Sequence, residues 1–131
     1  MENQVLTIEQ MQELIAMDID ISKASCTWCK VRAITPDRKG YSWMILPETL
    51  NKFDEEHVPT FTLQDILEIL PKYIDNYMLN IVPCCINNPV WMIEYINMDD
   101  EIEVLDEPIR ENSILEAAFN MLKWCKQNNY I

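Results

Sequence analysis

The residues best able to carry chemistry are the five cysteines and the single histidine of this 131-residue chain. Cys26 and Cys29 have the C-x-x-C spacing found in many zinc sites, and Cys84 with Cys85 could supply two further thiolates. Residues i and i+3 of a strand point to opposite faces, and no Gly, Pro or Asn stands between Cys26 and Cys29 to make a turn. We therefore expect no metal at these cysteines, and buried or half-exposed thiols instead.

The chain has only one glycine, Gly40, and only one histidine, His57. This scarcity excludes most other sequence motifs of catalysis and nucleotide binding. Phosphate-binding loops need two or three glycines, and H-E-x-x-H needs two imidazoles. His57 follows three acids, so we expect a solvated loop residue there. No serine stands in a G-x-S-x-G context. The sequence leaves enzymatic activity uncertain and favours a non-enzyme without a cofactor; a small metal-dependent enzyme stays an alternative.

Composition predicts one globular domain over residues 1–131, because 49% of the residues are hydrophobic and a chain of this length fills one core. The formal net charge of −12 disfavours direct binding to nucleic acid or to an anionic membrane surface, which requires clustered Lys and Arg. The acidic N-terminus lacks the features of a signal peptide, and prolines and asparagines interrupt the longest uncharged stretch, 76–93. We expect a cytoplasmic protein with reduced thiols.

Three helix starts carry a capping box, in which a Ser or Thr is followed three residues later by an acid or an amide. The pairs are Thr7 with Gln10, Thr62 with Asp65, and Ser113 with Glu116. Apolar stripes behind these caps predict helices from 8 to about 17, from 63 to 70, and from 114 to about 127. Pro71 ends the second helix.

Two strand pairs lie between these helices, each interrupted by turn residues. The predicted pairs are 26–34 with 41–46 and 77–82 with 90–96, and a fifth short strand is possible over 102–105. Consecutive hairpins usually join one antiparallel sheet, and amphipathic helices need a surface to cover. We therefore predict an α+β fold of order αββαββα, with three helices packed on one face of a single antiparallel sheet.

Charges are unevenly distributed along the chain. Residues 94–111 hold eight acids against Arg110 alone, whereas residues 23–39 hold five bases against Asp37. The acids that we name as candidate contact residues are Asp99, Asp100, Glu101, Glu103, Asp106 and Glu107. A solvated acidic loop that keeps the protein soluble is the simplest interpretation, and attraction to a basic partner is the functional one.

Aromatic residues of the first hairpin are further candidates for a contact surface. Trp28 shares a strand face with Lys30 and Arg32, and Trp43 shares one with Tyr41. If these side chains lie outside the core, a partner or a second copy of the chain covers them.

The strings VPTFTLQDILEILP over 58–71 and LEAAFNMLKWC over 115–125, with the ending Asn129-Tyr130-Ile131, resemble small uncharacterised proteins of gut bacterial genomes and their phages. The resemblance implies an accessory protein of a phage or mobile element and transfers no catalytic residue.

Taken together, these features favour a non-enzymatic, acidic protein-interaction module that binds a protein partner or a second copy of itself. The main alternative is an acidic inhibitor that mimics nucleic-acid phosphates and occupies the basic groove of another protein through residues 94–111.

Overall fold

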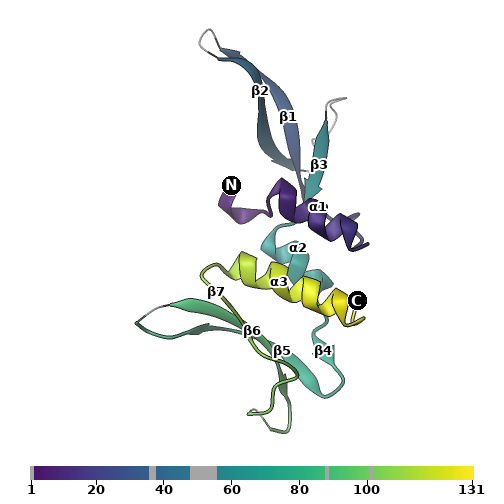
Figure 1. Ribbon diagram of the computed structural model, residues 1–131, viewed down its shortest axis with the longest axis vertical. Coiled ribbons are helices and arrows are strands. Elements are labelled where there is room, and N and C mark those ends of the chain that lie inside the picture. Colours follow the sequence, from purple (N-terminus) through teal and green to yellow (C-terminus); the bar gives the residue numbers. More distant parts are fainter. Residues whose placement is uncertain (1, 36–37, 48–55, 88, 101) are drawn as a thin grey trace. The chain divides into compact units, whose positions relative to one another are not determined.

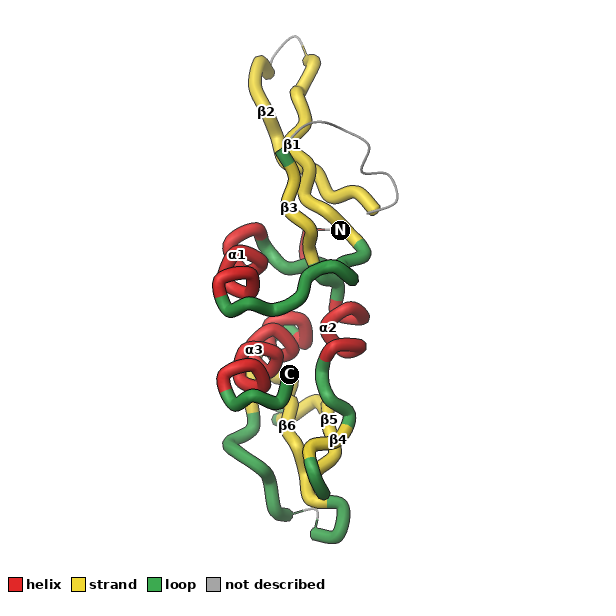
Figure 2. The backbone as a smooth tube through the Cα atoms, turned by 90° about the vertical axis from the view of Figure 1, so that its right-hand side faces the viewer, coloured by secondary structure: helices red, strands yellow, loops and turns green. Residues whose placement is uncertain are grey.

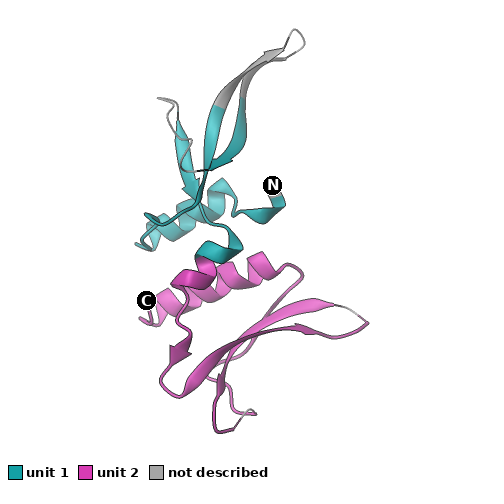
Figure 3. Cartoon of the chain, turned by 180° about the vertical axis from the view of Figure 1, so that it is seen from behind, with its two compact units in different colours: residues 1–65 teal, residues 66–131 magenta. Residues whose placement is uncertain are grey.

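The chain is described here by a computed structural model that covers residues 2–35, 38–47, 56–87, 89–100 and 102–131, without the side chains of 2, 31–35 and 38–41. These residues divide into two units, 1–65 and 66–131 (Figure 3). Helices and antiparallel sheets occur in both, so the α+β class is confirmed. The expectation of one domain over 1–131 stays a prediction. No helix within the described ranges has both the length and the apolar composition needed to cross a bilayer.

The described part of unit 1 holds a short 3-10 helix, one α-helix packed against a three-stranded sheet, and the start of a second α-helix. Its elements are η1 (Glu2–Gln4), α1 (Ile8–Ala16), β1 (Cys26–Thr35), β2 (Arg38–Pro47) and β3 (His57–Thr60). The sheet has the order β2–β1–β3 and is antiparallel throughout (Figures 1 and 2). The predicted cap of α1 is confirmed, since the Gln10 N–H donates to Thr7 Oγ1 at 3.1 Å and the Thr7 N–H donates to Gln10 Oε1 at 2.9 Å.

The backbone carbonyl of Leu6 organises the core of unit 1. It accepts a hydrogen bond from Trp28 Nε1 at 2.9 Å and another from Thr60 Oγ1 at 2.7 Å, while the Leu6 N–H donates to the carbonyl of Phe61 at 3.0 Å. These bonds fix the segment before α1 across β1 and β3. The apolar side chains packed there are Val5, Cys26 and Trp28, with the half-buried Ile8, Trp43, Ile45 and Val58.

Pro59 occupies an edge position that suits a residue without an N–H. Thr27 is its Cα partner in β1, and the Lys30 N–H donates to the carbonyl of Glu56 at 3.0 Å. Hydrogen-bonded and non-hydrogen-bonded pairs alternate along an antiparallel ladder, so the Thr27–Pro59 pair is a non-bonded one. The nitrogen of Pro59 therefore faces away from β1, and the ladder loses no hydrogen bond there.

Helix α2 (Leu63–Ile69) begins at the second predicted capping box. The Thr62 N–H donates to Asp65 Oδ2 at 2.9 Å, and the Asp65 N–H donates to Thr62 Oγ1 at 3.2 Å. Asp65 Oδ2 also accepts from the N–H and the hydroxyl of Ser25, at 3.1 and 2.7 Å. One buried carboxylate thus caps α2 and holds the chain just before β1. The helix ends before Pro71, as predicted.

Unit 2 is a four-stranded sheet covered by a helix. After the rest of α2 its elements are β4 (Tyr73–Ile74), β5 (Tyr77–Cys84), β6 (Val90–Asn97), β7 (Ile109–Glu111) and α3 (Ile114–Gln127). The sheet order is β4–β5–β6–β7, and α3 packs against β6 and β7 (Figure 1). The cap of α3 is Ser113, whose Oγ accepts from the Glu116 N–H at 3.4 Å. The predicted stripe of α3 is buried through Ala118, Met121, Leu122 and Cys125.

Both predicted hairpins are confirmed, but the single sheet that was to join them is wrong for the described residues, which form two sheets. The reason lies in three short strands that the hydrophobic pattern did not indicate. β3 pairs with β1, while β4 and β7 pair with β5 and β6. Each hairpin therefore pairs with short strands of its own and forms a separate sheet.

The segment 102–105 forms no strand; it contributes only an isolated bridge between Val104 and Ile96. Aspartate side chains compete for the backbone here, since Asp100 Oδ1 accepts from the Ile102 N–H at 3.1 Å. The second strand that pairs with β6, besides β5, is β7 instead. His57 is exposed as expected, but it begins β3 and does not lie in a loop.

The shared acceptor Asp65 generates the first prediction. Asp65→Ala removes the acceptor of the Thr62 N–H, which is half of the capping box of α2, and both bonds to Ser25, so we expect the free energy of unfolding to fall by about 2–3 kcal/mol. Asp20→Ala is the matched control, because exposed Asp20 accepts local hydrogen bonds from Ser22 alone, and we expect a clearly smaller change. Urea denaturation measures both, and equal effects would contradict the structural role of Asp65.

Candidate functional site

The aromatic surface expected on the first hairpin is not formed by Trp28. This side chain is only 9% exposed and donates its indole N–H to the Leu6 carbonyl. Trp28 is a core residue of unit 1, and the interpretation as an exposed anchor is wrong. The cause is that an aromatic residue on a strand face with charged neighbours can still be covered by a segment distant in sequence, here the segment before α1.

The other candidates on this hairpin are partly described. Lys30 forms an ion pair with Glu56, with Nζ and Oε2 3.5 Å apart. Trp43 is half-buried against the core of unit 1. Arg32 and Tyr41 are Cα partners across β1 and β2, and their side chains lie outside the described part of the chain. The described members of this set thus take part in local contacts of unit 1.

Five of the six acidic candidates, Asp99, Asp100, Glu103, Asp106 and Glu107, are exposed, and Glu101 lies outside the described residues. Several of these carboxylates are already acceptors within unit 2. Asp99 accepts from Asn76 Nδ2 at 2.9 Å, and Glu103 Oε1 accepts from the Tyr77 hydroxyl at 2.9 Å. The bond to Glu103 raises the pKa of Tyr77, because the proton is held between the phenol and a carboxylate.

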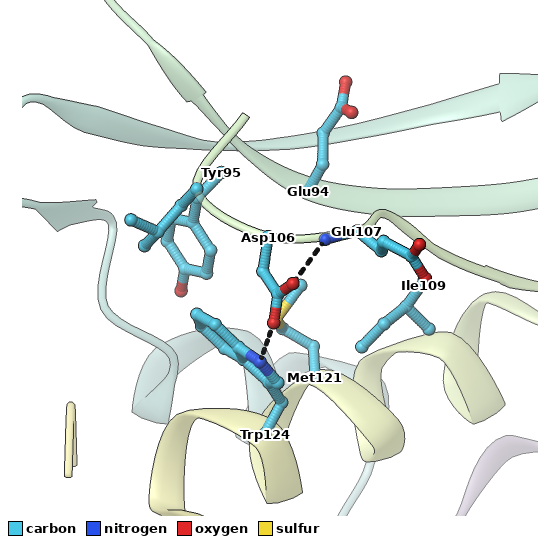
Figure 4. Close-up of a pocket in the computed structure, with 8 residues that line it drawn as sticks. Glu94, Tyr95, Asp106, Glu107, Ile109, Met121 and Trp124 are labelled. Atoms are coloured by element: carbon cyan, nitrogen blue, oxygen red, sulfur yellow. Dashed lines mark hydrogen bonds between the residues drawn. The ribbon is translucent and has the colours of Figure 1, made fainter. Parts of the chain in front are cut away.

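The structure brings Asp106 and Glu107 together with aromatic and apolar side chains in a small open pocket of unit 2 (Figure 4). The pocket lies between β6, the segment before β7, and α3. Its lining residues are Glu94, Tyr95, Leu105, Asp106, Glu107, Ile109, Met121 and Trp124. Figure 4 shows the Asp106 side chain directed at Trp124 and the Glu94 carboxylate directed away from both.

Trp124 is held in place by one hydrogen bond and two aromatic neighbours. Its Nε1–H donates to Asp106 Oδ2 at 2.7 Å, and Asp106 Oδ1 accepts from the Glu107 N–H at 2.8 Å. The Trp124 ring lies 6.3 Å from the ring of Tyr95 and 5.4 Å from that of Tyr130, measured between centroids. These contacts leave a half-buried indole beside exposed carboxylates.

One lining residue of the pocket, Tyr95, is buried and uncharged. The hydroxyl of buried Tyr95 donates to the carbonyl of Pro71 at 2.7 Å and lies 3.7 Å from Cys125 Sγ. Burial raises the pKa of Tyr95 far above its usual range, and burial also raises the pKa of the Cys125 thiol. Both groups therefore stay neutral near pH 7, and the negative charge next to Trp124 comes from the exposed carboxylates of Asp106 and Glu107, since the Glu94 carboxylate points away and accepts from Asn80 Nδ2.

This arrangement places two exposed carboxylates beside half-buried apolar and aromatic side chains. A surface of this kind has the chemistry to contact a cationic side chain, whose stem is apolar and whose head is charged. Across the described ranges, no group of three or more His, Cys, Asp or Glu side chains is placed to hold a metal ion.

Comparison with protein-family models, with curated proteins and with solved structures gave no match for this chain. The resemblance to proteins of gut bacteria and their phages stays a prediction.

Sequence reasoning named Asp106 and Glu107 but missed Tyr95, Met121 and Trp124. The apolar stripe of α3 accounted for Met121, and nothing in the pattern paired Trp124 with an acid 18 positions before it. One signal was present: an indole in the last turns of a helix needs an acceptor for its N–H, and the acidic segment is the richest source of acceptors.

The burial of Trp28 generates the second prediction. Trp28→Ala should lower the free energy of unfolding by about 3–5 kcal/mol, because a large core side chain is lost. Trp28→Phe should cost about 1–2 kcal/mol, because the Leu6 carbonyl loses one donor. Trp43→Phe is the control and should cost less than about 1 kcal/mol. Denaturant unfolding followed by circular dichroism measures all three, and an unchanged stability of Trp28→Ala would contradict its place in the core.

The third prediction concerns alkaline pH. The pKa of Tyr95 is higher in the folded unit than in the unfolded chain, so its contribution to stability is complete below the ordinary value of 10.0 and is lost as the pH rises above it. The free energy of unfolding should therefore fall less steeply above this ordinary value in Tyr95→Phe than in the wild type. Tyr73→Phe is the control, since Tyr73 is 59% exposed, and it should keep the wild-type slope. Identical slopes in all three proteins would contradict the assignment.

Proposed function

We propose that this protein is a non-enzymatic interaction module that binds a Lys or Arg side chain of a partner protein in the acidic pocket of unit 2. The observation that carries the proposal is the indole of Trp124, held by Asp106 at a pocket rim that also bears Glu107. The excess of acids over bases in residues 94–111 supports it, because such a segment attracts a basic surface over a longer range.

The surface around this small pocket suits the two parts of a basic side chain. Half-buried Leu105 and Ile109 offer apolar surface for the aliphatic stem, and half-buried Trp124 offers an aromatic ring for the cationic head. Among the described residues, the carboxylate of Glu107 has no hydrogen-bond or ion-pair partner, so it is available to a ligand. Arginine is the better ligand, because its planar guanidinium stacks on an indole and pairs with a carboxylate at the same time.

The strength of one such contact is limited. A partly exposed cation–π contact contributes about 0.5–1 kcal/mol and an exposed ion pair about the same. One basic side chain therefore gives weak binding, and a partner must present several bases along the exposed acidic segment. This places the proposed function among modules that recognise a basic surface or a basic peptide.

Several of the carboxylates accept hydrogen bonds within unit 2. This favours binding of a basic side chain at the pocket over mimicry of nucleic-acid phosphates. A phosphate mimic needs a row of acids free to face a basic groove. Here Asp99, Glu103 and Asp106 accept hydrogen bonds from side chains of the same unit, namely Asn76, Tyr77 and Trp124. These three acids already have partners within unit 2, so we rank the mimic second.

The fourth prediction tests the pocket in the whole chain. A blocked peptide with three arginines spaced by glycines should bind with a Kd on the order of 1 mM and should shift the indole N–H resonance of Trp124. Asp106→Asn with Glu107→Gln should weaken binding by about tenfold, because both rim charges are lost while the amide oxygen introduced at position 106 can still accept from Trp124. Titrations followed by nuclear magnetic resonance measure the affinities.

The matched control removes the same charge outside the pocket. Asp99→Asn with Asp100→Asn should weaken binding by less than about threefold, since only the long-range field changes. An equal loss in both double variants would indicate unspecific attraction and would favour the mimic. A Trp124 resonance that does not move, or equal binding of a peptide with glutamates in place of arginines, would overturn the proposal.

A further inference from the structure

Two neighbouring cysteines, Cys84 and Cys85, lie where β5 ends, and their sulfur atoms are 3.4 Å apart. Adjacent residues of a strand normally point to opposite faces of the sheet, which separates their side chains. Cys85 departs from this rule because its φ is 66°, in the left-handed region that residues with a Cβ rarely adopt. This backbone conformation turns the second thiol back toward the first.

These two cysteines are also more accessible to solvent than the other three. Cys85 is exposed and Cys84 is half-buried, whereas Cys26, Cys29 and Cys125 are at most 7% exposed. A reagent in solution therefore meets Cys85 first, with Cys84 directly behind it. The described neighbours include Ile86, which is 99% exposed, so nothing described covers this end of the hairpin.

The pKa of Cys85 depends mainly on its neighbour Cys84. Hydrogen bonding to Cys84 raises the pKa of Cys85, because one proton is held between the two sulfur atoms, while the Arg110 guanidinium acts in the opposite direction. The hydrogen bond between the two thiols is thus the largest influence on the pKa of Cys85.

We propose that Cys84 and Cys85 form a modification site that reacts reversibly with low-molecular-weight disulfides to give a disulfide between these adjacent residues. The Cys85 thiolate attacks one sulfur of the small disulfide, which forms a mixed disulfide and releases the first small thiol. The Cys84 thiolate then attacks the Cys85 sulfur and releases the second small thiol. The two cysteines lose two electrons and two protons, and the small disulfide gains them as two thiols, so the exchange is balanced.

The geometry explains why this bond forms and why it is easily reversed. The sulfur atoms must approach by only about 1.4 Å to reach the length of a disulfide. The ring that closes contains eight atoms and includes the peptide bond between the two residues. Strained and exposed disulfides have higher reduction potentials than structural ones, so small thiols reopen them readily.

The fifth prediction uses the whole chain and 2-hydroxyethyl disulfide as the probe. In the wild type, intact-mass and peptide mass spectrometry should find the loss of two hydrogen atoms at the Cys84–Cys85 peptide and no lasting adduct. In Cys84→Ser the mixed disulfide at Cys85 should persist at least about tenfold longer, because the second thiol is missing. A small thiol such as 2-mercaptoethanol should restore the reduced mass.

Two controls separate this site from general thiol chemistry. Cys26→Ser removes a buried thiol and should react like the wild type. The chain unfolded in urea should close the Cys84–Cys85 ring more slowly relative to adduct formation, since the left-handed conformation at Cys85 is lost. A stable adduct on both cysteines of the folded wild type, equal reaction at Cys26, Cys29 and Cys125, or equally fast closure in the unfolded chain would each overturn the proposal.

Discussion

The hydrogen bond between the Trp124 indole and Asp106 is the constraint on which the candidate site depends. It connects α3 to the acidic segment before β7, two parts of unit 2 that are otherwise joined through packing against the sheet. A charged acceptor makes this bond stronger than one between neutral groups. The same carboxylate that accepts the indole N–H also keeps a negative charge next to the ring. One side chain therefore positions the indole and, in the function that we propose, also contacts the basic ligand.

Helix positions and the two hairpins followed from local rules. Thr7, Thr62 and Ser113 mark helix starts through chemistry that acts over three residues, and all three caps are present. The arrangement of the sheets did not follow, because it depends on short strands whose pairing is decided by distant partners. His57–Thr60 carries no alternating pattern of its own and becomes a strand only because β1 offers it a free edge. Three residues of β7 likewise lack a signal at the level of sequence.

The candidate site was predictable in charge but not in geometry. Composition located the acidic segment, and it named Asp106 and Glu107. The pocket needed two facts of tertiary structure: that α3 packs against β6, and that the Trp124 indole finds its acceptor in this segment. The error at Trp28 has the same origin, since the Leu6 carbonyl that accepts its indole N–H lies 22 positions away. Spacing rules describe one element at a time and do not say which backbone segment will cover it.

Pro59 has a consequence for the behaviour of this protein at high concentration. Its nitrogen faces outward from β3, at a position where a strand added by another molecule would need an N–H donor. The proline nitrogen carries no N–H, so a sheet extended from that side would lack one hydrogen bond within a four-residue strand. Strand-by-strand growth of the kind that leads to fibrils is hindered at this edge by a single imino acid, which takes part in no contact proposed for binding.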